Sequence, residues 1–168
     1  MVIGKVDKPF VYGSAAFWQG KNIPESQHSH KWTVYLRGLE DEDLSYFIKS
    51  VAFTLHQSFA EPIRVLYQAP YEVSETGWGE FEIGITVTFH EASGLDPVEF
   101  KHGLKLFPGP NIAPTTKKPV IAEVYDEFVF VNPSKEWFDV LHSGPIRKVE
   151  NHPLTPYCQK TTNMHASK

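Results

Sequence analysis

Residues 81–90 read FEIGITVTFH, and the alternation within them decides the fold. Apolar side chains occupy every second position, and glutamate, glycine, threonine and histidine fill the positions after them. The apolar set consists of Phe81, Ile83, Ile85, Val87 and Phe89. Successive side chains of a β-strand point to opposite faces of the sheet, so this period of two predicts a strand with one buried and one solvated face.

Other segments with strand character follow one another along the chain. The segments are KPFVYGSAAF, HKWTVYLRG, IKSVAFTLH, IRVLYQAPYEV, PVEFKHGLKLF and VIAEVYDEFVFV. We expect IRVLYQAPYEV to break at Pro70 or to lie at a sheet edge, because proline cannot donate to a ladder. Only residues 44–50 and 133–142 are candidates for short helical turns. About seven or eight strands without helical periodicity between them indicate an all-β protein, an antiparallel β-sandwich.

The length of 168 residues suits one domain with a substantial core, followed by a tail. We expect the sandwich to occupy residues 1–131. For residues 132–168 we expect a short helical or extended extension and then a disordered tail, because HPLTPYCQKTTNMHASK is polar and has almost no periodicity.

Charge and composition exclude several classes of protein. A formal net charge of −4 disfavours nucleic-acid binding, which needs a basic face, and is compatible with a basic partner. The single cysteine, Cys158, cannot form an internal disulfide. The N-terminus lacks the apolar run of a signal peptide, and no segment approaches the roughly 20 apolar residues of a membrane span. We therefore expect a soluble intracellular protein that binds neither nucleic acid nor membrane.

Histidines are the first candidates for chemistry. His28 and His30 form an H-x-H pair, whose side chains point to one face of an extended segment, as in a cupin-like metalloenzyme. The alternative is structural: His30 begins the core face that continues to Trp32, and His28 lies in the preceding loop. The further ligands and glycine turns of a cupin site are not found in the sequence. We therefore expect no metal site and no cofactor.

Nucleophilic catalysis has less support than metal binding. Cys158 lies in the polar tail, where nothing orients a base beside it. Ser58 lies two residues after His56 and forms a Ser-His pair if the chain is extended there, but the sequence has no G-x-S-x-G elbow and no donor cluster for an oxyanion. The acidic pairs, Glu80 with Glu82 and the run from Asp41 to Asp43, are typical of solvated faces and a turn. We expect no enzyme.

Two short aromatic motifs contain the strongest candidates for the residues of a binding site. LHQSF ends one strand and contains His56, Ser58 and Phe59, while GWGEF opens another strand and contains Trp78. If the two loops lie at the same end of the sandwich, Phe59 and Trp78 face each other across a slot. Ser58 then offers a hydroxyl, which His56 holds in place. The pattern is equally compatible with Phe59 and Trp78 as plugs of the core.

These motifs, taken in order along the chain, resemble a YEATS domain. The matching segments are HSHKWTVYLRG, DLSYFIKSVAFTLHQSF, PIRVLYQAPYEVSETGWGEFEI and FKHGLKLF, and VIAEVYDEFVFVNPS extends the match. The branch to which they are similar is found in chromatin-remodelling and histone acetyltransferase complexes. The resemblance implies an immunoglobulin-like β-sandwich in the nucleus that reads acylated lysine, acetyl or crotonyl, on histone tails. It also implies subunits of such a complex as partners.

The resemblance also implies the residues of the site. The acyl-lysine enters a slot between walls that match Phe59 and Trp78. A serine matching Ser58, supported by His56, hydrogen-bonds the amide, and the backbone N–H of Trp78 meets the acyl carbonyl. The remaining pocket positions match His28, Gly77, Gly79 and Phe81.

The chemistry of the ligand agrees with this set of residues. The acyl amide is flat and neutral, so two aromatic planes can sandwich it. Its carbonyl needs a donor and its N–H an acceptor, which a backbone N–H and a hydroxyl supply. We expect the glycines beside Trp78 to let the backbone approach the ligand and to adopt angles that a side chain forbids. The alternative is a sandwich-type histone or complex-subunit interaction domain that ignores acylation.

Overall fold

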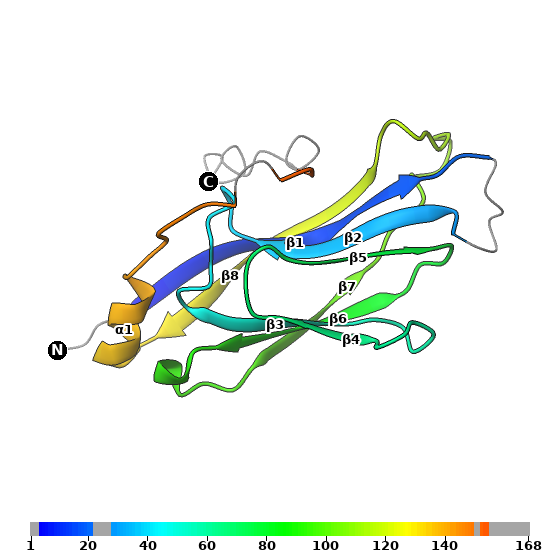
Figure 1. Ribbon diagram of the computed structural model, residues 1–168. Coiled ribbons are helices and arrows are strands. Elements are labelled where there is room, and N and C mark those ends of the chain that lie inside the picture. The colour runs from blue at the N-terminus through cyan, green and yellow to red at the C-terminus, as the bar shows by residue number, and fades with distance from the viewer. Residues whose placement is uncertain (1–3, 22–27, 150–151, 155–168) are drawn as a thin grey trace.

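The computed structural model describes residues 4–21, 28–149 and 152–154. Two antiparallel four-stranded sheets pack face to face, and the ends of their strands carry the loops (Figure 1). The first sheet has the strand order β5-β2-β1-β8, and the second has the order β4-β3-β6-β7. This architecture confirms the expected immunoglobulin-like antiparallel β-sandwich.

The strands of the first sheet are β1 (Lys5–Trp18), β2 (His30–Arg37), β5 (Tyr71–Gly77) and β8 (Val120–Val131). Those of the second sheet are β3 (Ile48–Thr54), β4 (Ile63–Leu66), β6 (Glu82–Phe89) and β7 (Val98–Gly103). A 3-10 turn, η1 (Glu91–Ser93), follows β6, and a helix, α1 (Lys135–Leu141), follows β8.

The core lies between the sheets and follows the predicted alternation. Ile83, Ile85 and Val87 of β6 are fully buried, and the side chains between them are exposed or half-buried. The first sheet meets them with residues such as Trp32 and Val34 of β2. Burial of these apolar faces is the main favourable contribution to folding.

The segment that contains Pro70 divides between the two sheets. Its first part forms β4 and its second part forms β5, and each is the edge strand of its own sheet. The expected break and the expected edge position are therefore both observed. The crossover between the sheets occupies residues 67–70, which are outside the strands.

A buried polar contact links the two sheets. His102 of β7 faces the core, as predicted by its position in PVEFKHGLKLF, where it alternates in step with Leu104 and Leu106. Its Nε2 lies 2.9 Å from Oγ of Ser14 on β1. Both side chains are buried. Burial lowers the pKa of His102, because the charged imidazolium would lose its hydration there.

Residues 133–142 form a helical element, as expected, and it packs on the sandwich. Ser134 caps α1 by accepting the N–H of Trp137 at 3.1 Å. Trp137 and Leu141 are buried, and the Trp137 ring contacts Phe89 and Phe130 of the core. The other candidate, residues 44–50, makes a single turn in which the N–H groups of Phe47 and Ile48 both donate to the carbonyl of Leu44, and the chain then enters β3 at Ile48.

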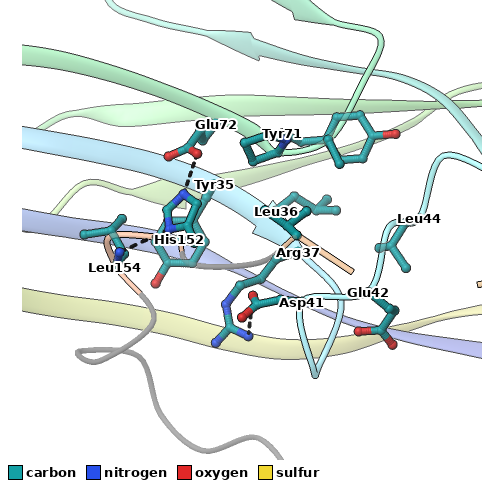
Figure 2. A pocket seen from close by; sticks show the side chains of 13 residues that line it. Tyr35, Leu36, Arg37, Asp41, Glu42, Leu44, Tyr71, Glu72, His152 and Leu154 are labelled. Atoms are coloured by element: carbon teal, nitrogen blue, oxygen red, sulfur yellow. Dashed lines mark hydrogen bonds and ion pairs between the residues drawn. The ribbon is translucent and has the colours of Figure 1, made fainter. Parts of the chain in front are cut away.

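The chain after α1 returns along the outer face of the first sheet, and we call residues 146–149 with 152–154 the C-terminal strap. The N–H of Val149 donates to the carbonyl of Asp41 at 2.7 Å. Figure 2 shows His152 of the strap against Glu72 of β5, with Nε2 and Oε1 2.5 Å apart. Leu154 is buried with Tyr35. The strap closes a small apolar pocket over the end of β2.

The side chain of Asp43, which the sequence places in a turn, is not exposed to solvent. Asp43 is buried, and its carboxylate accepts from the N–H of Ser45 at 2.8 Å and from Nε of Arg147 at 2.5 Å. Burial raises the pKa of Asp43, but the bonds from Ser45 and Arg147 outweigh that effect and hold the pKa below its usual value. Asp43 therefore anchors the C-terminal strap.

Some of the expectations from sequence fall on residues that the structure does not describe. Cys158 and the polar stretch from residue 155 onward lie outside the described residues. The boundary expected after residue 131 stays a prediction. In the part of the chain that the structure describes, no helix is long and apolar enough to cross a membrane.

Candidate functional site

The two aromatic loops lie at the same end of the sandwich and share one cavity of about 640 Å³. The register of the sheets brings them there: Gly77, the last residue of β5, pairs with His30 at the start of β2, and Thr54 at the end of β3 pairs with Gly84 near the start of β6. All the site residues expected from sequence line the cavity: His28, His56, Ser58, Phe59, Gly77, Trp78, Gly79 and Phe81. The lining also includes Ala60, Glu75, Thr76 and Glu80, which sequence reasoning had not assigned to the site.

Residues 55–62 form a compact loop between β3 and β4. The N–H of Leu55 donates to the carbonyl of Pro62 at 2.7 Å and closes the base of the loop. Within the loop, the N–H of Phe59 donates to the carbonyl of His56 at 3.0 Å, which makes a tight turn. This turn brings the side chains of His56, Ser58 and Phe59 to one cavity.

The hydrogen bonds of His56 fix the direction of the Ser58 hydroxyl. The backbone N–H of Ser58 donates to Nδ1 of His56 at 3.1 Å, so this nitrogen is an acceptor and carries no proton. The Ser58 Oγ lies 2.8 Å from the same nitrogen, so the hydroxyl must be the donor of that bond. Its oxygen lone pairs are thereby left as acceptors at the cavity.

The two aromatic residues have different environments. Phe59 is half-buried, meets Trp32 edge-on with ring centroids 5.9 Å apart, and lies 5.6 Å from Phe81. Trp78 is 60% exposed. The interpretation of Trp78 as a core plug is therefore wrong, whereas Phe59 both packs on the core and lines the cavity.

The glycines beside Trp78 do not have the backbone angles that we expected. The left-handed glycines of the described chain are Gly4, Gly20 and Gly94, so the expectation of forbidden angles at Gly77 and Gly79 was wrong. A Cβ on Gly79 would meet nothing within 4 Å. Gly79 therefore leaves open space at the cavity, whereas a Cβ on Gly77 would contact Nε1 of Trp32 at 3.6 Å. Close approach of a ligand there stays a prediction.

The loop that carries Trp78 is anchored on its far side by Glu80. The Glu80 Oε2 accepts the N–H of Leu106 at 2.8 Å, and the N–H of Leu104 donates to the carbonyl of Phe81 at 2.9 Å. The sequence placed Glu80 only on a solvated face, because its partner Leu106 lies beyond the end of β7.

The H-x-H pair is divided between core and surface. His30 is buried at the start of β2, and its ring meets Phe107 edge-on. His28 is exposed in the preceding loop, with Nδ1 2.5 Å from Oγ1 of Thr76. The structural alternative was therefore right. Among the described residues, no three His, Cys, Asp or Glu side chains lie together as metal ligands.

Comparisons with known proteins give a consistent set of relatives. A family model described as the YEATS family matches residues 27–108. The chain is 47% identical over 154 residues to transcription initiation factor TFIID subunit 14b of Arabidopsis thaliana, covering 91% of this chain and 54% of that protein. It is 38% identical to the protein AF-9 homolog of Saccharomyces cerevisiae, covering 83% of this chain and 70% of that protein.

Solved structures similar to this chain include complexes with modified histone peptides. The Yaf9 YEATS domain bound to H3K27ac is 38% identical with a TM-score of 0.74, and the match covers 86% of this chain and 97% of that one. The Yaf9 YEATS domain recognizing an H3K122suc peptide is 39% identical with a TM-score of 0.72, covering 83% and 95%.

Proposed function

Because this chain belongs to the YEATS family, we propose that it is a chromatin reader that binds acylated lysine on histone tails and recruits a chromatin-modifying or remodelling complex. The observation that carries the proposal is the single cavity in which Phe59, Trp78 and the oriented Ser58 hydroxyl come together. The similar Yaf9 domains that bind H3K27ac and H3K122suc peptides support it.

The acyl amide would be recognised by contacts to each of its parts. Phe59 and Trp78 would sandwich its plane, and aromatic contacts of this kind contribute about 0.5–1.5 kcal/mol each beyond burial. The amide N–H would donate to Ser58, whose hydroxyl proton is already committed to His56. The backbone N–H of Trp78 would donate to the acyl carbonyl.

The same site would disfavour unmodified lysine. Its ammonium group would have to lose hydration on entering the slot, which is costly without a charged partner. The carboxylates of Glu75 and Glu80 also line the cavity, but Glu75 is already paired with Arg64 and Glu80 already accepts the N–H of Leu106. The ammonium carries only donors, so it could pair with Ser58 but would oppose the backbone N–H of Trp78. Discrimination would therefore rest on both hydrogen bonds and on the aromatic walls.

The names of the relatives support a wider role in transcription or chromatin complexes. TFIID subunit 14b and the AF-9 homologs support a nuclear location and a place among transcription or chromatin complexes. We expect subunits of a remodelling or acetyltransferase complex as partners, no cofactor and no catalysis. Acetyl and crotonyl groups are the acyl groups that we expect the slot to accept.

Titration with histone H3 peptides tests the proposal. Acetylated, crotonylated and unmodified forms of one peptide would be titrated into the wild-type chain and into Trp78→Ala. The wild type is expected to bind the two acylated forms more tightly than the unmodified form, and Trp78→Ala to lose that preference. Binding that is equal for all three forms and insensitive to Trp78→Ala would instead indicate an interaction domain that ignores acylation.

A further inference from the structure

The side chain of Arg64 joins the two sheets beside the cavity. Arg64 lies on β4 of the second sheet, and its Nη2 donates to Oε2 of Glu75, on β5 of the first sheet, at 2.8 Å. The same guanidinium donates to the carbonyl of Ala60 at 2.8 Å and to that of Glu61 at 2.6 Å. One side chain thus holds both β5 and the loop that precedes β4.

These contacts join the two segments that carry the walls of the cavity. Glu75 and Ala60 both belong to its lining. Phe59 immediately precedes Ala60, and Trp78 follows Glu75 by three residues. β4 and β5 are the edge strands of different sheets, so a β-ladder does not fix one wall against the other on this side. Arg64 supplies a polar link there, in addition to the packing of Phe59 on Trp32.

The backbone at Glu61 gives an independent sign that the loop depends on Arg64. Glu61 has a φ of 48°, in the left-handed region that residues other than glycine seldom occupy. Such conformations persist where surrounding contacts stabilise them. The carbonyl of this residue accepts from Nε of Arg64, so the guanidinium binds the loop at its strained position.

The burial and shape of the pair suit it to a positioning role. The side chains of Arg64 and Glu75 are only 25% and 28% exposed, so water screens them less than it screens a surface ion pair. A guanidinium presents its donors in a rigid plane, and it reaches a carboxylate and two carbonyls together. The ammonium group of a lysine lacks that fork.

We infer that Arg64 and Glu75 are positioning residues of the slot, which set the separation and tilt between the wall of Phe59 and the wall of Trp78. This inference rests on the proposed function, because the ligand amide is flat and its contacts fall off within about an ångström of the best separation. The preference for acylated over unmodified lysine then depends on a pair that acts through Phe59 and Trp78.

Substitution of Arg64 in the full 168-residue chain tests the inference. Arg64→Lys is expected to weaken binding of an acetylated histone H3 peptide by up to roughly tenfold, the loss expected when one aromatic wall contact is displaced, and to reduce the ratio of acetylated to unmodified affinity. Glu75→Gln is expected to shift the ratio in the same direction. The matched control is Lys49→Gln, which removes the 3.0 Å ion pair with Glu91 away from the cavity and should leave the ratio unchanged.

Amide hydrogen exchange provides a readout that needs no ligand. In Arg64→Lys, the amides of residues 56–61 should exchange faster than in wild type, while those of β6 keep their rates. If Arg64→Lys keeps the wild-type ratio of acetylated to unmodified affinity, the inference is overturned. It is also overturned if Arg64→Lys loses the same affinity for both peptides and its melting temperature falls. A wild-type chain that ignores acetylation would overturn the proposed function; faster exchange at 56–61 would still support the hold of Arg64 on the loop.

Discussion

The hydroxyl of Ser58 and Nδ1 of His56 lie 2.8 Å apart, and the same nitrogen also accepts the backbone N–H of Ser58 at 3.1 Å. Two donors of one residue therefore converge on one ring nitrogen. This arrangement commits the proton of the hydroxyl and makes Ser58 an acceptor toward the cavity. Under the proposed function, His56 acts on the ligand through Ser58.

Removal of either member of this pair should weaken binding of acylated peptide. Ser58→Ala leaves the amide N–H of the ligand without an acceptor in a largely apolar slot, which costs roughly 1–3 kcal/mol. His56→Phe keeps a ring but removes the acceptor, so the hydroxyl can turn its proton toward the ligand. Isothermal titration with an acetylated peptide measures both effects. Wild-type affinity in His56→Phe would show that the hydroxyl needs no partner.

Trp78→Ala should leave folding stability nearly unchanged. Trp78 is 60% exposed, so its removal takes little apolar surface out of the core. The matched control is Trp32→Ala, because Trp32 is fully buried beside Phe59 and Phe81, and such truncations cost about 3–5 kcal/mol. Urea denaturation measures both variants. If the two variants lose similar free energies of unfolding, Trp78 belongs to the core and not to the slot.

Stability should fall on mild acidification because of His102. Burial lowers the pKa of His102 in the folded chain, so below the usual value of 6.5 the unfolded chain takes up a proton before the folded chain does. The stabilisation is complete above that value and is lost as pH falls toward the lower folded pKa. Melting temperatures at pH 7.5 and 5.5 measure the loss.

The control for this prediction is His102→Gln, which keeps a polar group toward Ser14 but does not titrate. Its melting temperature should be lower overall and should change less between the two pH values. The remaining histidines are the same in both chains. A difference between the chains in how the melting temperature changes with pH is therefore due to His102. An equal slope in the two chains would contradict the assignment.

The strands and the site residues could be predicted because their signals are local. The alternation around Ile85 reflects the geometry of a single strand, and the motifs LHQSF and GWGEF each place their residues in one loop. The resemblance to the YEATS family then predicts that the two loops share one site. The core-facing parity of His102 was likewise visible in its segment, although its partner Ser14 was not.

Long-range pairing could not be predicted, because a charged residue in a loop looks the same whether it is solvated or buried. Asp43 pairs with Arg147, which lies 104 residues further along the chain, and no sequence pattern around either residue indicates the pairing. Arg64 and Glu75 are separated by only 11 residues, but they pair because β4 and β5 enter different sheets. The angles of Gly77 were misjudged for a related reason, since glycine permits unusual angles without requiring them.

A chain that ends at residue 131, the boundary expected from sequence, should be less stable than the full chain. The helix α1 lies beyond that boundary, yet its Trp137 is 2% exposed and contacts Phe89 and Phe130. Truncation would expose these rings, and Trp137→Ala alone should cost about 3–5 kcal/mol. The control is Phe138→Ala, since Phe138 is only half-buried. If urea denaturation gives the truncated chain the same free energy of unfolding as the full chain, the sandwich folds independently of α1.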